Sequence, residues 1–314
     1  MEPKATREGY GDALAEIAAK NKNVVALDAD LNDSTRSDYI KKIDPSRFIN
    51  MGIAEQNMIG TAAGLAASGK IPFASTFAIF SERAFEFTRN IVSRNKLNVK
   101  IVGSHAGIFT GEDGKSAQAI EDIAIYRALP NMVVLQPCDY IETKKAMHAL
   151  VKYRGPSFLR LLRNPLPIIH DESYNFEIGK GEILRKGQDA VIFATGTMVH
   201  ESLKAAEILK ENKINVYVAN IHTIKPIDKK LITDLAKKTN CVITAEDHNI
   251  IGGLGGAVAE VLGENYPCLM KRIGLEDCYG ESGKPAELYE KYGLSANQIT
   301  RKVKDFLKRK QKLK

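Results

Sequence analysis

The sequence contains no tryptophan, only four cysteines and no long apolar segment. Cys138, Cys241, Cys268 and Cys278 show no CxxC or metal-type spacing, which argues against a disulfide framework and suits a reducing cytoplasm. No apolar run approaches the ~20 residues that span a bilayer. The amino terminus is charged and lacks the apolar core of a signal peptide. We therefore expect a cytoplasmic protein with no membrane partner.

An excess of one charge sign is absent from most of the chain. The last fourteen residues contain eight Lys/Arg and one Asp, and so they account for the whole net charge of +7. A nucleic-acid-binding surface would spread its basic residues over a folded face. A basic segment that ends a helix is more often solvated and favoured by the helix dipole. We therefore expect no nucleic-acid partner, and the sequence leaves the role of this basic tail open.

The distribution of apolar residues predicts an α/β fold. Short β-rich runs alternate with longer segments of helical period, which is typical of mostly parallel sheets covered by helices on both faces. The expected strands are 23–27, 70–74, 99–102, 132–135, 157–161, 190–194, 215–219 and 241–244. The expected helices are 10–20, 57–68, 80–92, 117–129, 140–152, 199–211 and 231–238.

The length of 314 residues favours two domains. Between Asn164 and Lys186 the chain contains two prolines and several polar residues, without helical periodicity. This composition suits a linker, or an edge hairpin that introduces a second domain. We expect one domain over 1–168, a linker over 169–186, and a second domain with the basic tail over 187–314.

The most informative segment begins at Met51 and reads MGIAEQNMIGTAAGLAASGKIPFASTF. Glu55 lies just before a predicted helix rich in alanine and glycine, whose small residues allow close packing against another backbone. A glutamate at a helix start also has a structural explanation, because it caps the helix and favours the positive end of the dipole. Taken alone, Glu55 therefore indicates no more than a helix start.

The wider stretch GIAEQNMIGTAAGLAASGKIPFASTFAIF resembles the pyrimidine-binding domain of transketolases. The resemblance implies that Glu55 contacts a ring nitrogen of thiamine diphosphate and activates the cofactor as an acid–base group. Phe77 and Phe80 match the aromatic residues around the pyrimidine, with Phe80 as the stacking platform. Core packing is the alternative for either phenylalanine considered alone.

Further family residues follow in order along the chain. Arg7 in KATREG and Arg163 in GPSFLRLLRNP match two arginines that bind the substrate phosphate. In VVALDADLNDST, Asp30 matches a position close to the cofactor and Ser34 one beside the phosphate. Two arginines and a serine at one point would form a charge-assisted phosphate clamp.

The segment GSHAGIFTGEDGKSAQAIEDIA supplies the rest of the implied substrate site. His105 matches a catalytic histidine of the substrate channel, and Asp113 an aspartate that recognises a sugar hydroxyl. Two positions depart from the family pattern. Ala117 stands where many members have a histidine, and Arg83 where many have a tyrosine near the pyrimidine. The sequence leaves open how either change affects activity.

The carboxy-terminal half also resembles transketolase, through ATGTMVHESLKAAEIL and TAEDHNIIGGLGGAVAEVL. The family's GDG motif, which binds the cofactor's diphosphate and its divalent metal, is absent. We predict no metal ligands in this chain. The resemblance therefore implies a split transketolase, in which an amino-terminal subunit carrying GDG holds the diphosphate with Mg2+ or Ca2+. We expect the two chains to form an α2β2 assembly in which this one homodimerises.

The implied reaction transfers a two-carbon ketol unit from a ketose phosphate to an aldose phosphate, as in the pentose phosphate pathway. One alternative is the beta subunit of a 2-oxo-acid dehydrogenase, which shares both domains and the activating glutamate. The GEDG sequence and the two arginines favour sugar phosphates instead. A non-catalytic regulatory subunit is the other alternative, and the retention of Glu55 with Phe80 argues against it.

Overall fold

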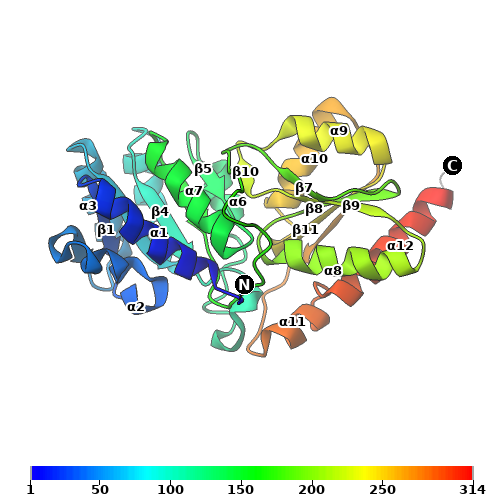
Figure 1. Cartoon of the computed structure of the whole chain (residues 1–314), viewed down its shortest axis with the longest axis horizontal. Helices are drawn as coiled ribbons and strands as arrows, with labels where there is room; N and C mark the ends of the chain where they lie inside the picture. The colour runs from blue at the N-terminus through cyan, green and yellow to red at the C-terminus, as the bar shows by residue number, and fades with distance from the viewer. Residues whose placement is uncertain (1, 313–314) are drawn as a thin grey trace.

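The computed structural model describes residues 2–312, which form two mostly parallel sheets with helices on both faces (Figure 1). The first sheet has the order β10-β5-β6-β4-β3-β1-β2, and all its strands except β10 are parallel. The first-half strands are β1 (Val24–Asp28), β2 (Phe48–Asn50), β3 (Ile71–Phe77), β4 (Lys100–Ser104), β5 (Val133–Leu135) and β6 (Ser157–Arg160). The expected fold class is confirmed.

Helices bury both faces of this sheet. On one face, α1 (Thr6–Lys20) and α7 (Tyr140–Lys152) share a cluster of buried apolar side chains with the strands. On the other face lie α3 (Glu55–Ala67) and α6 (Asp122–Ala128). Because both faces are covered, every residue of β1 and β4 is buried, which explains why the first four residues of β1 are all apolar.

The second sheet has the order β12-β11-β8-β9-β7. Its strands are β7 (Glu182–Arg185), β8 (Ala190–Ala194), β9 (Val216–Asn220), β11 (Val242–Asn249) and β12 (Met270–Leu275). Its helices are α8 (Thr197–Glu211), α9 (Lys229–Thr239), α10 (Leu254–Asn265), α11 (Pro285–Lys291) and α12 (Ala296–Lys312). The edge strand β7 pairs antiparallel with β9. The 169–186 segment, expected as a linker, therefore includes a strand of the second sheet.

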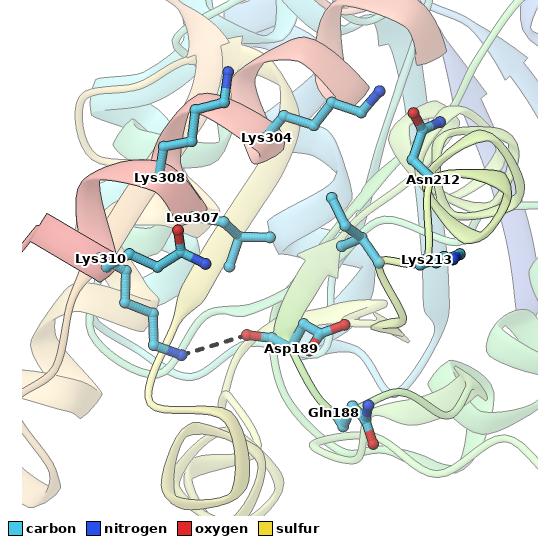
Figure 2. Close-up of a pocket in the computed structure, with 10 residues that line it drawn as sticks. Gln188, Asp189, Asn212, Lys213, Lys304, Leu307, Lys308 and Lys310 are labelled. Atoms are coloured by element: carbon cyan, nitrogen blue, oxygen red, sulfur yellow. Dashed lines mark hydrogen bonds between the residues drawn. The ribbon is translucent and has the colours of Figure 1, made fainter.

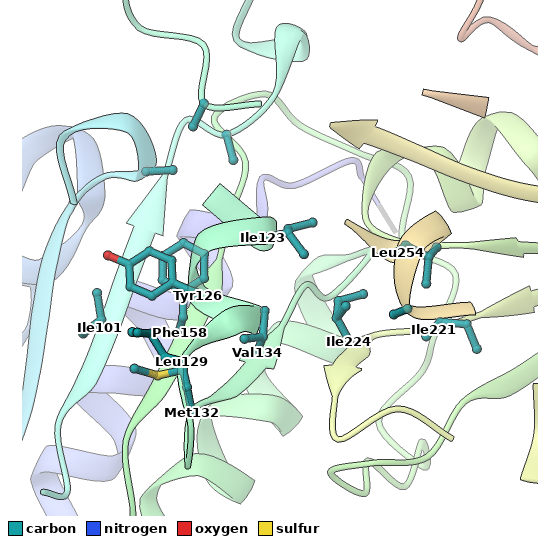
Figure 3. Close-up of a cluster of buried hydrophobic side chains, with 14 of the residues drawn as sticks. Ile101, Ile123, Tyr126, Leu129, Met132, Val134, Phe158, Ile221, Ile224 and Leu254 are labelled. Carbon is teal, nitrogen blue, oxygen red and sulfur yellow. The ribbon is translucent and has the colours of Figure 1, made fainter. Parts of the chain in front are cut away.

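The two halves of the chain are joined by one strand that crosses between them and by a common apolar core. Strand β10 (Thr223–Lys225) comes from the second half of the chain but pairs antiparallel with β5 of the first sheet. One apolar cluster contains Tyr126 and Phe158 from the first half together with Ile221 and Leu254 from the second (Figure 3). The two halves therefore bury apolar surface together, which joins them more firmly than a polar interface would.

The predicted helix over 80–92 is wrong as a single element. It divides into α4 (Ala78–Ser81), a 3-10 turn (Glu82–Ala84), α5 (Phe85–Phe87) and a π-helical turn (Thr88–Ser93). Irregular helical turns of this kind are often found at functional sites. The irregular segment begins beside the predicted cofactor residues.

The basic tail belongs to α12, whose apolar side docks on the second domain. Val303 and Phe306 are buried, and Lys310 Nζ donates to the carbonyl of Thr239 at 2.7 Å. Residues 313–314 of the predicted tail lie outside the described residues. Within the described chain, no helix is both long and apolar enough to cross a membrane.

Candidate active site

The predicted site residues gather at the carboxyl ends of the parallel strands in the first sheet. Asp30 follows β1, Phe77 ends β3, His105 directly follows β4, and Arg163 follows β6. In open α/β sheets this edge is where ligands bind, because the loops that leave the strands converge there. Residues far apart in the sequence therefore reach one place.

A cavity of 230 Å³ opens at this edge. It is lined by Ala29, Asp30, Leu31, Ile53, Glu55, Phe80 and Arg83. Three of the predicted cofactor residues thus share one apolar-walled space. Glu55 is the first residue of α3, its side chain is only 2% exposed, and its Oε2 atom has no hydrogen-bond donor among the described residues. An orphaned buried carboxylate of this kind fits a ligand that presents a donor or a basic ring nitrogen.

Arg83 lies beside this carboxylate and partly neutralises its negative charge. Its Nη1 atom lies 3.5 Å from Glu55 Oε2, and its side chain is 56% exposed. At this length the contact is a loose ion pair rather than a good hydrogen bond. The exposed guanidinium has room to turn toward solvent when a ligand approaches Glu55. No role could be assigned to Arg83 from the sequence, and in the structure it forms an ion pair with the predicted catalytic acid.

Phe77 connects the cavity to the predicted substrate residues. Its ring stacks on Phe80, with centroids 5.5 Å apart and an interplanar angle of 14°. It also stacks on His105, with centroids 3.8 Å apart. Phe77 therefore sets the spacing between the two halves of the site.

His105 is buried and held in one orientation. Its Nδ1 atom lies 2.8 Å from Ser104 Oγ, and its Nε2 atom lies 3.4 Å from Arg7 Nη1. Since a guanidinium can only donate, we assign the proton to Nδ1 and the lone pair to Nε2. Burial, together with the charges of Arg7, Arg163 and Arg36, lowers the pKa of His105 to about 3. At neutral pH the imidazole is therefore uncharged, and its Nε2 lone pair can accept a hydrogen bond from a hydroxyl.

The remaining predicted substrate residues form two pairs. Arg7 Nη1 donates to the carbonyl of Ser34 at 2.8 Å. Arg163 Nη1 donates to Asp113 Oδ1 at 2.9 Å, with both side chains about one third exposed. The sequence assigned these last two residues to separate tasks, whereas the structure makes them an ion pair. Each side chain therefore neutralises the charge of the other.

The sequence did not indicate Asp28, which shapes the turn over 28–37. Its buried carboxylate accepts hydrogen bonds from Leu31 N at 2.6 Å, Thr35 Oγ1 at 2.6 Å and Ser37 Oγ at 2.7 Å. Burial raises the pKa of Asp28 to about 6, although these hydrogen bonds act in the opposite direction. A polar residue that ends a buried apolar strand was the available signal.

Asp247 of β11 connects the second domain to a loop of the site. Its carboxylate is fully buried and accepts from the backbone N–H groups of Ile108 at 2.9 Å and Phe109 at 3.1 Å. Gly107 passes so close that a Cβ there would lie 2.2 Å from Asp247 Oδ2, and its φ of +74° also favours glycine. The loop that begins at His105 is therefore fixed from the second domain.

Two other features do not involve the predicted residues. A larger cavity of 590 Å³ lies in the second domain between α12 and the turn after α8 (Figure 2), lined by four lysines and neutral residues around Asp189. Cys138, Asp139 and His170 also lie close enough to suggest a metal site. However, both ring nitrogens of His170 are already bonded, to Asp139 Oδ2 and Glu182 Oε2, each at 2.8 Å. A metal would have to displace one of these bonds.

The His170 network predicts a pH-dependent stability. Burial alone would lower the pKa of His170, but the hydrogen bonds to Asp139 and Glu182 outweigh it and raise the pKa to about 10, from 6.5. The resulting stabilisation is complete below about pH 6.5 and is lost as pH rises through 10. Urea unfolding of the wild type should therefore show a loss of stability toward alkaline pH that His170→Gln lacks. Parallel curves for the two proteins would contradict this assignment.

The fold defines a two-domain α/β protein with a cavity at the carboxyl ends of the strands in the first sheet. Residues 2–168 match the transketolase pyrimidine-binding domain, and residues 179–299 match the transketolase C-terminal domain. The chain belongs to the transketolase family and corresponds to its carboxy-terminal section. The resemblance seen in the motifs is confirmed.

Three relatives are similar over almost their whole length. A protein of Methanocaldococcus jannaschii described as a transketolase C-terminal section is 51% identical, over 98% of this chain and 97% of that protein. A 6-deoxy-6-sulfo-D-fructose transketolase subunit of a Clostridium strain is 43% identical, over 99% and 97%. A solved structure of a split-gene transketolase, described as an inactive beta4 tetramer, has a TM-score of 0.91 and 46% identity, over 97% of this chain and 98% of that one.

Proposed function

We propose that this chain is the carboxy-terminal subunit of a thiamine-diphosphate-dependent transketolase and transfers a two-carbon ketol unit from a ketose phosphate to an aldose phosphate. The proposal rests above all on the cavity in which Glu55 lies with Phe80, one stacked ring away from His105. The membership in the transketolase family, whose enzymes use thiamine diphosphate, supports the same reaction. The active complex would form in the cytoplasm.

The residues of the cavity fit the pyrimidine end of the cofactor. When bound, thiamine diphosphate supplies the nucleophile and the electron sink that carbon–carbon bond cleavage requires. Phe80 would offer its ring face to the pyrimidine, and Phe77 and Asp30 would border it. Glu55 would hold or exchange a proton at the pyrimidine ring nitrogen, in a site that excludes water.

The substrate residues would act beside the cofactor. Arg7, Ser34 and Arg163 would hold the phosphate end of the sugar, and Asp113 would accept a hydrogen bond from a sugar hydroxyl. His105 would contact a reacting hydroxyl through its Nε2 lone pair, in place of the Arg7 guanidinium that lies 3.4 Å from it. Its neutral imidazole suits this role because a cation there could not accept a hydrogen bond from the hydroxyl.

A partner subunit would complete the site. An amino-terminal transketolase subunit with the GDG motif would bind the diphosphate and its Mg2+ or Ca2+, and an α2β2 assembly would bring both halves together. The inactive state stated for the beta4 relative supports the expectation that this chain alone is inactive. Without the metal-bound diphosphate anchor, its own affinity for the cofactor would be weak.

The decisive experiment is reconstitution with the amino-terminal subunit of the same organism. With thiamine diphosphate and magnesium, the complex should convert xylulose 5-phosphate and ribose 5-phosphate, whereas each chain alone should not. Turnover of pyruvate with a lipoyl acceptor, and none of sugar phosphates, would overturn the assignment in favour of a 2-oxo-acid dehydrogenase. Unchanged activity of the amino-terminal subunit without this chain would indicate a regulatory role.

A further inference from the structure

A third arginine lies beside the proposed phosphate residues. Arg36 directly follows α2 (Asn32–Thr35) and has a left-handed backbone, with a φ of +69°. Its Nη1 atom donates to the carbonyl of Asp33, while Arg7 Nη1 donates to the next carbonyl, that of Ser34, at 2.8 Å. Two guanidinium groups therefore flank Ser34 at the end of this short helix.

A glutamate orients Arg36 toward this position. Arg36 Nε donates to Glu8 Oε1 at 3.0 Å, and Tyr39 Oη donates to Glu8 Oε2 at 3.4 Å. Glu8 follows Arg7 on α1, so adjacent residues of one helix hold both arginines in relation to Ser34. The side chain of Arg36 is 28% exposed, and its Nη2 atom makes no hydrogen bond within the described residues. The Nη2 edge of the guanidinium is thus free to donate to a ligand.

The local charges favour a doubly negative ligand. Arg7, Arg36 and Arg163 all contribute to the low pKa of His105, so their fields meet at the substrate residues. Arg36 is paired with Glu8 and Arg163 with Asp113, whereas Arg7 has no carboxylate partner among the described residues and its positive charge is left over. A phosphate dianion gains more from this surplus than a singly charged or neutral group does.

We propose that Arg36 is a specificity-determining residue, which adds a third guanidinium beside Ser34 and selects sugars with a terminal phosphate. This inference rests on the proposed function, because it concerns the same substrate site. It also identifies a ligand preference: a phosphate dianion should be favoured over a sulfonate monoanion in the same position. Arg36 is hydrogen-bonded to Glu8 and Asp33 and not to Glu55 or His105, so its main effect should be on binding.

The test compares matched acceptors in the reconstituted complex. Arg36→Gln should raise the KM for ribose 5-phosphate by about 10-fold, the loss typical of one charge-assisted hydrogen bond. The KM for ribose, which lacks the phosphate, should stay the same, and so should kcat for both acceptors. Arg185→Gln is the control, because Arg185 pairs with Glu207 in the second domain. It should leave both KM values unchanged.

A binding measurement separates this inference from the proposed function. Calorimetric titration of inorganic phosphate into the complex requires no turnover, and Arg36→Gln should weaken phosphate binding relative to wild type and Arg185→Gln. If the wild type binds phosphate through Arg36 but transfers no ketol unit, the proposed function fails and the phosphate site stands. If Arg36→Gln leaves phosphate affinity unchanged, or raises the KM of ribose as much as that of ribose 5-phosphate, the specificity role is overturned.

Discussion

Replacing Glu55 with glutamine is expected to lower the turnover of the reconstituted complex by roughly 100- to 10,000-fold, the range that general acid–base groups contribute. Glutamine keeps the size of the side chain and can still form hydrogen bonds, but it cannot exchange a proton with a ring nitrogen. Glu55 is buried in the cavity with Phe80, and its Oε2 atom has no hydrogen-bond donor. The loss should therefore reflect chemistry rather than a missing contact.

The measurement is the initial rate of ketol transfer with saturating thiamine diphosphate. Glu207→Gln is a suitable control because Glu207 is 68% exposed on the second domain, and it should keep the wild-type rate. Thermal unfolding of Glu55→Gln should match that of the wild type, because the Oε2 atom has no hydrogen-bond donor to lose. Near-normal turnover of Glu55→Gln would show that Glu55 does not activate the cofactor.

The second large effect concerns stability. Arg160 of β6 and Asp122 of α6 are both 0% exposed, and Arg160 Nε donates to Asp122 Oδ2 at 2.7 Å. The guanidinium also donates to the carbonyl of Asp247 in the second domain at 3.0 Å. Asp122→Ala would leave the cation buried without its counter-ion, which typically costs about 3–5 kcal/mol of the free energy of unfolding.

Urea unfolding of three variants tests this prediction. Glu260→Ala removes the exposed partner of Arg127, and such a surface pair should contribute no more than about 1 kcal/mol. The double variant Asp122→Ala/Arg160→Met removes both buried charges and should be more stable than Asp122→Ala alone. A loss for Asp122→Ala no larger than that for Glu260→Ala, or no recovery in the double variant, would mean that the buried charge is not the cause.

The sequence predicted those elements whose signal is local. Apolar runs such as 190–194 and 99–102 coincide closely with β8 and β4, because buried parallel strands show their character over four or five residues. The three-residue strands β2 and β10 were not predicted. Strand β10 forms because it meets β5 across the domain boundary, and no pattern within Thr223–Lys225 carries that information.

Within the site, too, some features could be predicted from local sequence and others could not. Residues such as Glu55 and Phe80 could be named because the family motif carries them. The ion pair between Arg163 and Asp113 joins two loops, and the bonds from Asp247 cross domains. These contacts depend on how the chain folds in three dimensions. The left-handed backbone of Asp30, Arg36 and His105 was not predicted either, since these residue types do not by themselves indicate a positive φ.

The pairing of β10 with β5 across the two domains has a consequence for how this polypeptide can be divided. A cut near the start of β7 would separate β5 from β10 and leave β5 at the open edge of the first sheet. Unpaired edge strands expose backbone groups that promote aggregation. The same cut would remove the carboxylate of Asp247 from the loop that begins at His105. We therefore expect the two domains to fold as one unit, and neither half to keep its native structure after such a cut.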